Sequence, residues 1–194
     1  MRQILLGALA FGLAFCFDWV SWLRIRRLKP LLGLAAAATL AVALLWTLAT
    51  PGHFHWPRWT PLIGWPLLAL STLLLAYSLF IELPLATTYV RQGSASTLVR
   101  TGTYALVRHP GVLWLWLWLG AWVLVSRGRL MLVAAIVWSL LDTVYVWLQE
   151  VTLLPRMFPG YAAYQKETPM LLPTRQSLIR CLRTLPGRSQ ASPP

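Results

Sequence analysis

The residues best suited to chemistry in this sequence stand directly in front of an apolar run. Arg108, His109 and Pro110 precede a tryptophan-rich segment. Pro110 suits the first position of a helix, where its missing N–H costs nothing, which makes His109 the expected N-cap. The positive end of a helix favours an anion, and the Arg108 guanidinium adds bidentate donors. The triplet therefore predicts a site for a carboxylate or phosphate, unless Arg108 only anchors the helix at the lipid headgroups.

A second group of candidate residues follows the next apolar run. Glu150 stands at its end beside Gln149, and Tyr161 and Tyr164 follow in a more polar segment. The two apolar runs can fold as a helical hairpin, which would return Glu150 to the end of the molecule that holds Arg108. A carboxylate near a bilayer is costly unless it is paired or hydrated, so it marks a functional site by default. A simple structural ion pair between Arg108 and Glu150 is the alternative.

The composition places these residues in a membrane protein. Of the 194 residues, 58% are hydrophobic and only 11% are charged, whereas about a quarter of the residues in a soluble domain are charged. The net charge of +12 comes mainly from residues between the apolar runs and in the tail, which indicates contact with anionic membrane lipids and not with nucleic acid. Cys16 and Cys181 form neither a zinc pattern nor a redox pair, and we expect no bound metal.

Five apolar runs come close to the roughly 20 residues that a membrane-spanning helix needs. The first should be a retained helix and not a signal peptide, because bulky Phe residues stand where a cleavage site needs small ones. The predicted spans are 3–22, 31–50, 61–83, 111–126 and 130–150. The predicted fold is all-α and polytopic, with a cytoplasmic C-terminal region. Its parts are N-terminal transmembrane helices (1–97), a core with both candidate groups (98–173) and a basic tail (174–194).

The positive charges between the spans predict the sidedness of the protein. The loop between the first two spans contains the densest basic cluster of any short loop, formed by Arg24, Arg26, Arg27 and Lys29. Because short basic loops stay in the cytoplasm, the N-terminus should lie outside and the C-terminus inside. The expected location is the bacterial inner membrane.

Together the two groups resemble the motifs of membrane methyltransferases related to isoprenylcysteine carboxyl methyltransferase and the phospholipid methyltransferases. The shared pattern is Gly-x-Tyr, Arg-His-Pro, a helical hairpin, a Glu pair and Tyr-x-x-Tyr before a proline. The matching residues here are Gly102, Tyr104, Arg108, His109, Pro110, Glu150, Leu153, Tyr161, Tyr164 and Pro173. The resemblance covers residues 98–173, and its first half also looks like the NnrU-like membrane proteins of the same broad group.

The resemblance implies a methyltransferase that uses S-adenosylmethionine and takes its acceptor from the membrane. Arg108 would grip a carboxylate or phosphate and Glu150 a cationic or hydroxyl-bearing group, as the catalytic pair. The other cofactor-binding residues would be Gly102, Tyr104, His109, Pro110, Gln149, Tyr161 and Tyr164. The acceptor would be a lipidic or small molecule of the prenylcysteine carboxylate, lipid amine or small thiol type. A membrane-interface aromatic belt is the alternative role for the two last tyrosines.

The chain departs from the family pattern in three places. Val112 stands where a Tyr usually follows Arg-His-Pro, Gln149 replaces the first Glu of the pair, and Phe158 stands in place of a Gly. Two other interpretations therefore stay open. One is a sterol-reductase-like enzyme that uses NADPH and shares a similar helix entrance, and the other is a non-catalytic membrane scaffold or partner subunit.

Spacing predicts three further features. Asp142 shares a helix face with Tyr145 and Gln149, so it should be a buried residue that faces the bundle. Glu82, just before Pro84, is a candidate partner for an Arg of the following loop. In the tail, apolar and basic residues alternate as in a short interfacial helix on anionic lipid. These residues are Leu178, Ile179, Leu182 and Leu185, with Arg175, Arg180, Arg183 and Arg188.

The predicted sidedness has a direct test. A fluorescent reporter that matures only in the cytoplasm should be fluorescent when it is fused after Pro194. An alkaline phosphatase fused at the same position should be inactive, because its disulfides need an oxidising compartment. The reverse pattern would place the C-terminus outside and contradict the assignment.

Overall fold

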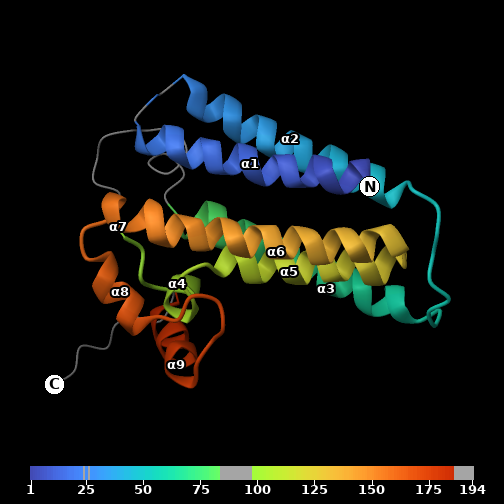
Figure 1. Cartoon of the computed structure of the whole chain (residues 1–194). Helices are drawn as coiled ribbons and strands as arrows, with labels where there is room; N and C mark the ends of the chain where they lie inside the picture. The colour runs from blue at the N-terminus through green and yellow to red at the C-terminus, as the bar shows by residue number, and fades with distance from the viewer. Residues whose placement is uncertain (24, 26, 84–97, 186–194) are drawn as a thin grey trace.

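The chain folds almost entirely into helices. The structure is a computed structural model that describes residues 1–23, 25, 27–83 and 98–185, and these ranges contain helices and no strands. The long helices are α1 (Arg2–Trp22), α2 (Leu28–Leu48), α3 (Thr60–Ala76), α5 (Pro110–Ser126) and α6 (Arg129–Thr152) (Figure 1). A π-helical turn, η1 (Tyr77–Ile81), continues α3. The short helices are α4 (Thr103–Leu106), α7 (Leu154–Met157), α8 (Tyr161–Glu167) and α9 (Arg175–Thr184).

Four of the helices in the described ranges are long and apolar enough to cross a membrane: α1, α2, α6, and α3 together with η1. The remaining predicted span corresponds to α5, which has 17 residues. At 1.5 Å per residue α5 is about 26 Å long, slightly less than the roughly 30 Å of a bilayer core. The all-α prediction is confirmed for the described residues, and each of the five long apolar runs is helical.

The long helices form two groups that meet along α6. α1 packs against α2, α5 packs between α3 and α6, and α6 contacts both α1 and α2 (Figure 1). Trp138 of α6 is fully buried at this junction and donates its indole N–H to the carbonyl of Ile4 at 3.2 Å. Small residues permit the close approach, since a Cβ at Gly7 would lie 2.2 Å from the Trp138 ring. Close packing at small residues is the usual basis of helix association in a membrane.

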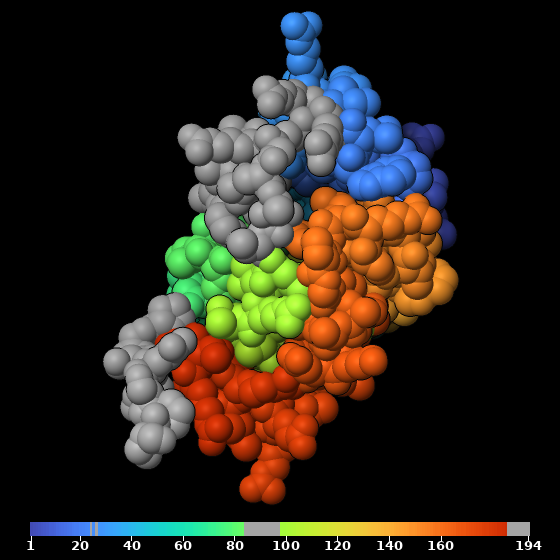
Figure 2. Space-filling view, turned by 90° about the vertical axis from the view of Figure 1, so that its left-hand side faces the viewer, coloured from blue at the N-terminus to red at the C-terminus, as the bar shows by residue number. Residues whose placement is uncertain are grey.

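The two ends of the bundle carry different structures. The N-terminus, the 51–59 loop and the α5–α6 turn lie at one end, where Arg129 donates its N–H to the carbonyl of Gly52 at 2.9 Å. At the opposite end lie α4, α7, α8 and α9 (Figure 1). Figure 2 looks onto this end and shows the region of α4 between η1, the end of α6 and the C-terminal helices. The two candidate groups of residues belong to this end.

Several residues named from the sequence lie outside the described ranges. They are Arg24, Arg26, Pro84 and Arg188. Lys29, which the sequence assigns to the same basic loop as Arg24, instead lies in the first turn of α2 and is only 5% exposed. Its ammonium group is 5.4 Å from the centre of the Phe17 ring, so this charge is turned toward α1.

The contact between α1 and α6 can be tested with two glycines of one helix. A Cβ at Gly7 meets the buried Trp138 ring, whereas a Cβ at Gly12 meets no described atom within 4 Å. Gly7→Ala should cost about 2 kcal/mol through overpacking, which lowers the melting temperature in detergent by about 4–8 °C. Gly12→Ala should leave the melting temperature unchanged or slightly higher, because Ala favours helix. Equal melting temperatures for the two variants would contradict the packing of α1 on Trp138.

Candidate functional site

The start of α5 is built as the sequence predicts. Pro110 is in the first turn of the helix and His109 is the N-cap residue. The His109 side chain does not cap the helix, however, and its ring is turned toward α6. Backbone hydrogen bonds hold the segment in place, because Arg108 donates its N–H to the carbonyl of Pro169 at 2.9 Å and His109 donates to that of Met170 at 3.3 Å. The segment after α8 therefore fixes the position of both side chains.

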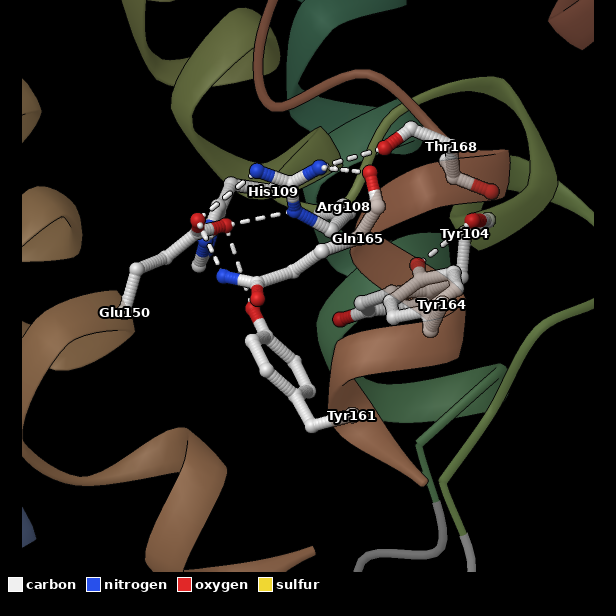
Figure 3. A network of polar contacts seen from close by, with 8 residues as sticks. All are labelled: Tyr104, Arg108, His109, Glu150, Tyr161, Tyr164, Gln165 and Thr168. Atoms are coloured by element: carbon white, nitrogen blue, oxygen red, sulfur yellow. Dashed lines mark hydrogen bonds and ion pairs between the residues drawn. The ribbon is translucent and has the colours of Figure 1, made fainter.

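Glu150 is the centre of the polar cluster at this end (Figure 3). It lies in the last turn of α6 and its side chain is 7% exposed. Arg108 donates to both carboxylate oxygens, from Nε at 2.6 Å and from Nη2 at 2.7 Å. His109 Nε2 lies 2.9 Å from Oε1. The Tyr161 hydroxyl donates to Oε1 at 3.1 Å, and Gln165 Nε2 donates to Oε2 at 3.2 Å.

Arg108 connects this carboxylate to the backbone after α8. Its Nη1 donates to the carbonyls of Gln165 at 3.1 Å and Thr168 at 2.5 Å. Burial lowers the pKa of Arg108, but the hydrogen bonds and charge of Glu150 outweigh burial and hold that pKa above its usual value. The guanidinium is thus a permanent cation with hydrogen-bond partners on both sides, Glu150 on one and the backbone carbonyls on the other. Its bidentate pairing with a carboxylate belongs to the stronger class of hydrogen bonds.

The two tyrosines of α8 have different roles. Tyr161 is 3% exposed and points to Glu150, and burial together with that charge raises the pKa of its hydroxyl, which therefore stays a proton donor. Tyr164 is turned the other way and donates to the carbonyl of Tyr104 in α4 at 2.6 Å (Figure 3). The Tyr104 hydroxyl in turn donates to the carbonyl of Ser78 at 3.3 Å. Tyr164 and Tyr104 thus join α8, α4 and η1.

The structure places Gln149 in a second polar cluster. Its Nε2 donates to Asp18 Oδ2 of α1 at 2.6 Å and to the Tyr145 hydroxyl at 2.8 Å. The Tyr145 hydroxyl also donates to Asp18 Oδ2. Gln149 and Glu150 therefore point to different neighbours, although they are consecutive on α6. Asp142, on the same face, is buried as predicted at 6% exposure.

Sequence analysis missed Asp18 as a member of this cluster. It stands alone in an apolar run, and its partners come from a helix more than a hundred residues later in the chain. The signal available in the sequence was an unpaired acid within a predicted span, which requires a partner in the bundle.

Gly102 and Glu82 fix the approach to α4. Glu82 Oε1 accepts a hydrogen bond from the Thr103 N–H at 2.8 Å, and Glu82 Oε2 accepts one from the Thr103 hydroxyl. Gly102 has a φ of +59°, and a Cβ there would lie 1.7 Å from Glu82 Oε1. Its N–H donates to the Thr184 hydroxyl of α9 at 2.9 Å. Glu82 thus binds the start of α4. The expected pairing of Glu82 with an Arg of the following loop involves residues 84–97, which lie outside the described ranges.

An open apolar groove lies beside the cluster. It has a volume of about 440 Å³ and is lined by Trp116 of α5 and by Pro169, Met170, Leu171 and Leu172. The carbonyls of Pro169 and Met170 are the ones that accept the backbone hydrogen bonds of Arg108 and His109. The groove and the polar cluster therefore share one segment of chain.

The cluster combines groups that bind opposite charges. Arg108 can bind a carboxylate or phosphate, and Glu150 with the carbonyls of Gln165 and Thr168 can accept from an ammonium or hydroxyl group. Within the described residues, no three His, Cys, Asp or Glu side chains are placed to hold a metal ion. Comparison of the chain with family models, curated proteins and solved structures finds no match.

Removing the charge of Glu150 should destabilise the protein, because it leaves the buried Arg108 cation without its partner. Glu150→Gln should cost about 3 kcal/mol, which corresponds to a fall of about 6–12 °C in melting temperature. Glu167→Gln is the matched control, since Glu167 lies on α8 with an exposed side chain. It should change the melting temperature by about 1 °C or less. An equal effect of the two substitutions would show that Glu150 does not hold this end together.

Proposed function

We propose that the protein is an integral membrane methyltransferase that uses S-adenosylmethionine and acts on a lipidic or membrane-accessible acceptor. The observation that carries the proposal is the meeting of Arg108 and His109 with Glu150 and Tyr161 in one cluster. These residues come from two blocks some forty residues apart, and they are the blocks in which the sequence resembles the membrane methyltransferases. An apolar groove beside the cluster supports an acceptor with an apolar part.

The proposal includes the arrangement in the membrane. We infer that α5 crosses the bilayer with the four longer spans, because it packs between α3 and α6 along their length. With five crossings the N-terminus and the α7–α9 end face opposite sides. The basic loop between α1 and α2 then puts the cluster on the cytoplasmic side of a bacterial inner membrane, where soluble cofactors are available.

The chemistry of the cluster fits the cofactor. S-adenosylmethionine carries a carboxylate, an ammonium and ribose hydroxyls, and it supplies an electrophilic methyl group for transfer. Arg108 would hold the carboxylate, and Glu150 with the Gln165 and Thr168 carbonyls would hold the cationic or hydroxyl-bearing part. Because these protein groups are bonded to one another in the structure, binding requires that Arg108 and Glu150 exchange part of their pairing for contacts with the ligand.

The groove beside the cluster would receive the apolar part of the acceptor. It is open to the outside and lined almost entirely by apolar surface, so a chain that enters from the lipid could lie along it. Trp116 and the 169–172 segment would pack against a prenyl or acyl chain, which would place the reacting end of a prenylcysteine carboxylate, lipid amine or thiol near the charged pair. Burial around Arg108 would exclude water from that end.

One observation favours a second candidate function, a non-catalytic membrane scaffold. Both oxygens of Glu150 accept hydrogen bonds from side chains of the protein itself, and Arg108 is satisfied in the same way. A cluster that only joins α6 to the C-terminal helices would have this geometry. The two functions differ in whether the cluster opens to a ligand.

Ligand binding separates these functions. S-adenosylhomocysteine at about one hundred times its Kd should stabilise the purified protein by about 2.7 kcal/mol, which raises its melting temperature in detergent by about 5–10 °C. NADPH at the same concentration should give no shift, and a shift with NADPH alone would favour the reductase interpretation. If neither ligand changes the melting temperature, the scaffold is the better description.

A matched pair of tyrosines locates the binding site. Tyr161 and Tyr145 both donate a hydroxyl hydrogen bond to a carboxylate, that of Glu150 and that of Asp18 respectively. Tyr161→Phe should weaken S-adenosylhomocysteine binding by at least about tenfold, or 1.4 kcal/mol, whereas Tyr145→Phe should leave the affinity unchanged. Isothermal titration of both variants measures the difference. Equal affinities would remove Glu150 and its partners from the cofactor site.

A further inference from the structure

The helix α9 turns its apolar side away from the protein. Leu178, Ile179 and Leu182 are 48%, 40% and 45% exposed, whereas Ser177 and Cys181 on the other side of the helix are buried. A soluble amphipathic helix does the opposite and packs its apolar side on the core. Leu178 and Ile179 are therefore turned away from the core to which Cys181 belongs.

The inner side of α9 is fixed by polar and small residues. Thr174 caps the helix together with Ser177, and Cys181 packs against Ala105, Leu106 and Val107 at α4. The Thr184 hydroxyl accepts from the Gly102 N–H at 2.9 Å. Arg180 donates to the carbonyl of Glu167 at the end of α8. These contacts hold α9 in the orientation that leaves Leu178 and Ile179 outward.

The outward side of α9 is basic as well as apolar. At 100° per residue, Arg175 falls on the same side as Leu178 and Leu182, and Arg183 follows Ile179 by one turn. Both arginines are exposed, and the helix contains no acidic residue. Exposed aliphatic side chains with flanking arginines match the boundary between acyl chains and anionic headgroups, where Arg pairs with phosphate.

The position of α9 agrees with such a surface. It lies at the edge of the end formed by α4 and α8, where the long helices terminate (Figures 1 and 2). With 10 residues, α9 is far shorter than the roughly 20 residues that a span needs. A helix of this length and charge can lie on a membrane surface but cannot cross the membrane.

We propose that α9 docks on the anionic lipid surface that surrounds the spans, through Leu178, Ile179 and Leu182 with Arg175 and Arg183. Phosphate-bearing anionic lipids such as phosphatidylglycerol have the required chemistry. A second copy of this chain is a poorer partner, because two such faces would bring their arginines together without any acid to pair with them. The proposal does not depend on the proposed function.

Amide hydrogen exchange of the full chain in lipid nanodiscs tests the proposal. In nanodiscs with one third phosphatidylglycerol, the amides of 175–184 should exchange at least about fivefold more slowly than in phosphatidylcholine nanodiscs, which corresponds to roughly 1 kcal/mol for one basic side chain near anionic lipid. Equal exchange rates in the two lipid compositions would overturn the proposal.

Two charge-reversal variants provide the matched control. Arg183→Glu should remove at least half of the protection by phosphatidylglycerol, while Lys166→Glu, an exposed position on α8, should keep it although the net charge changes equally. The same loss in both variants would mean that the total charge, and not this face of α9, senses the lipid. Protection that appears only in nanodiscs with two copies of the protein would identify a second copy as the partner and also overturn the proposal.

Discussion

The buried carboxylate of Glu150 is the constraint on which this end of the molecule depends. An ionised group that is 7% exposed carries a large desolvation cost, which only several donors with good geometry can offset. Those donors come from the start of α5 and from α8, so satisfying one side chain fixes the relative positions of three helices. The chain after α6 folds back toward α5, and the backbone hydrogen bonds of Arg108 and His109 to Pro169 and Met170 complete the closure.

Much of this arrangement could be predicted from the sequence, because its strongest signals are local. Apolar runs of about twenty residues form helices in lipid whatever their partners, and Pro110 fixes the start of α5 through its own ring. The meeting of Arg108 with Glu150 also followed from a local argument, since a hairpin of two similar helices must bring its outer ends together. The sidedness, the cofactor and the acceptor stay predictions.

The parts that sequence analysis did not foresee depend on contacts between distant segments. Gln149 was grouped with Glu150 because the two are adjacent, but adjacent residues on a helix point about 100° apart. Gln149 donates its hydrogen bond to Asp18 of α1, and the spacing of residues within α6 gives no sign of that partner. In the same way, the carbonyls that accept hydrogen bonds from Arg108 belong to the backbone of Gln165 and Thr168. Every residue type has a backbone carbonyl, so the sequence does not predict these contacts. The position of Lys29 in the sequence predicts a charge in the loop before α2, but its side chain turns toward Phe17 of α1.

The adjacency of Gln149 and Glu150 has a mechanical consequence. The last turn of α6 is hydrogen-bonded on one side to Asp18 of α1 and on another side to Arg108. It therefore connects the α1–α2 pair with the end of the molecule formed by α4, α7, α8 and α9. A rotation of α6 about its axis cannot loosen one polar cluster without moving the other, because both are rigidly attached to the same helical turn. The position of the Glu150 carboxylate therefore depends on how α6 lies against α1 as well as on Arg108.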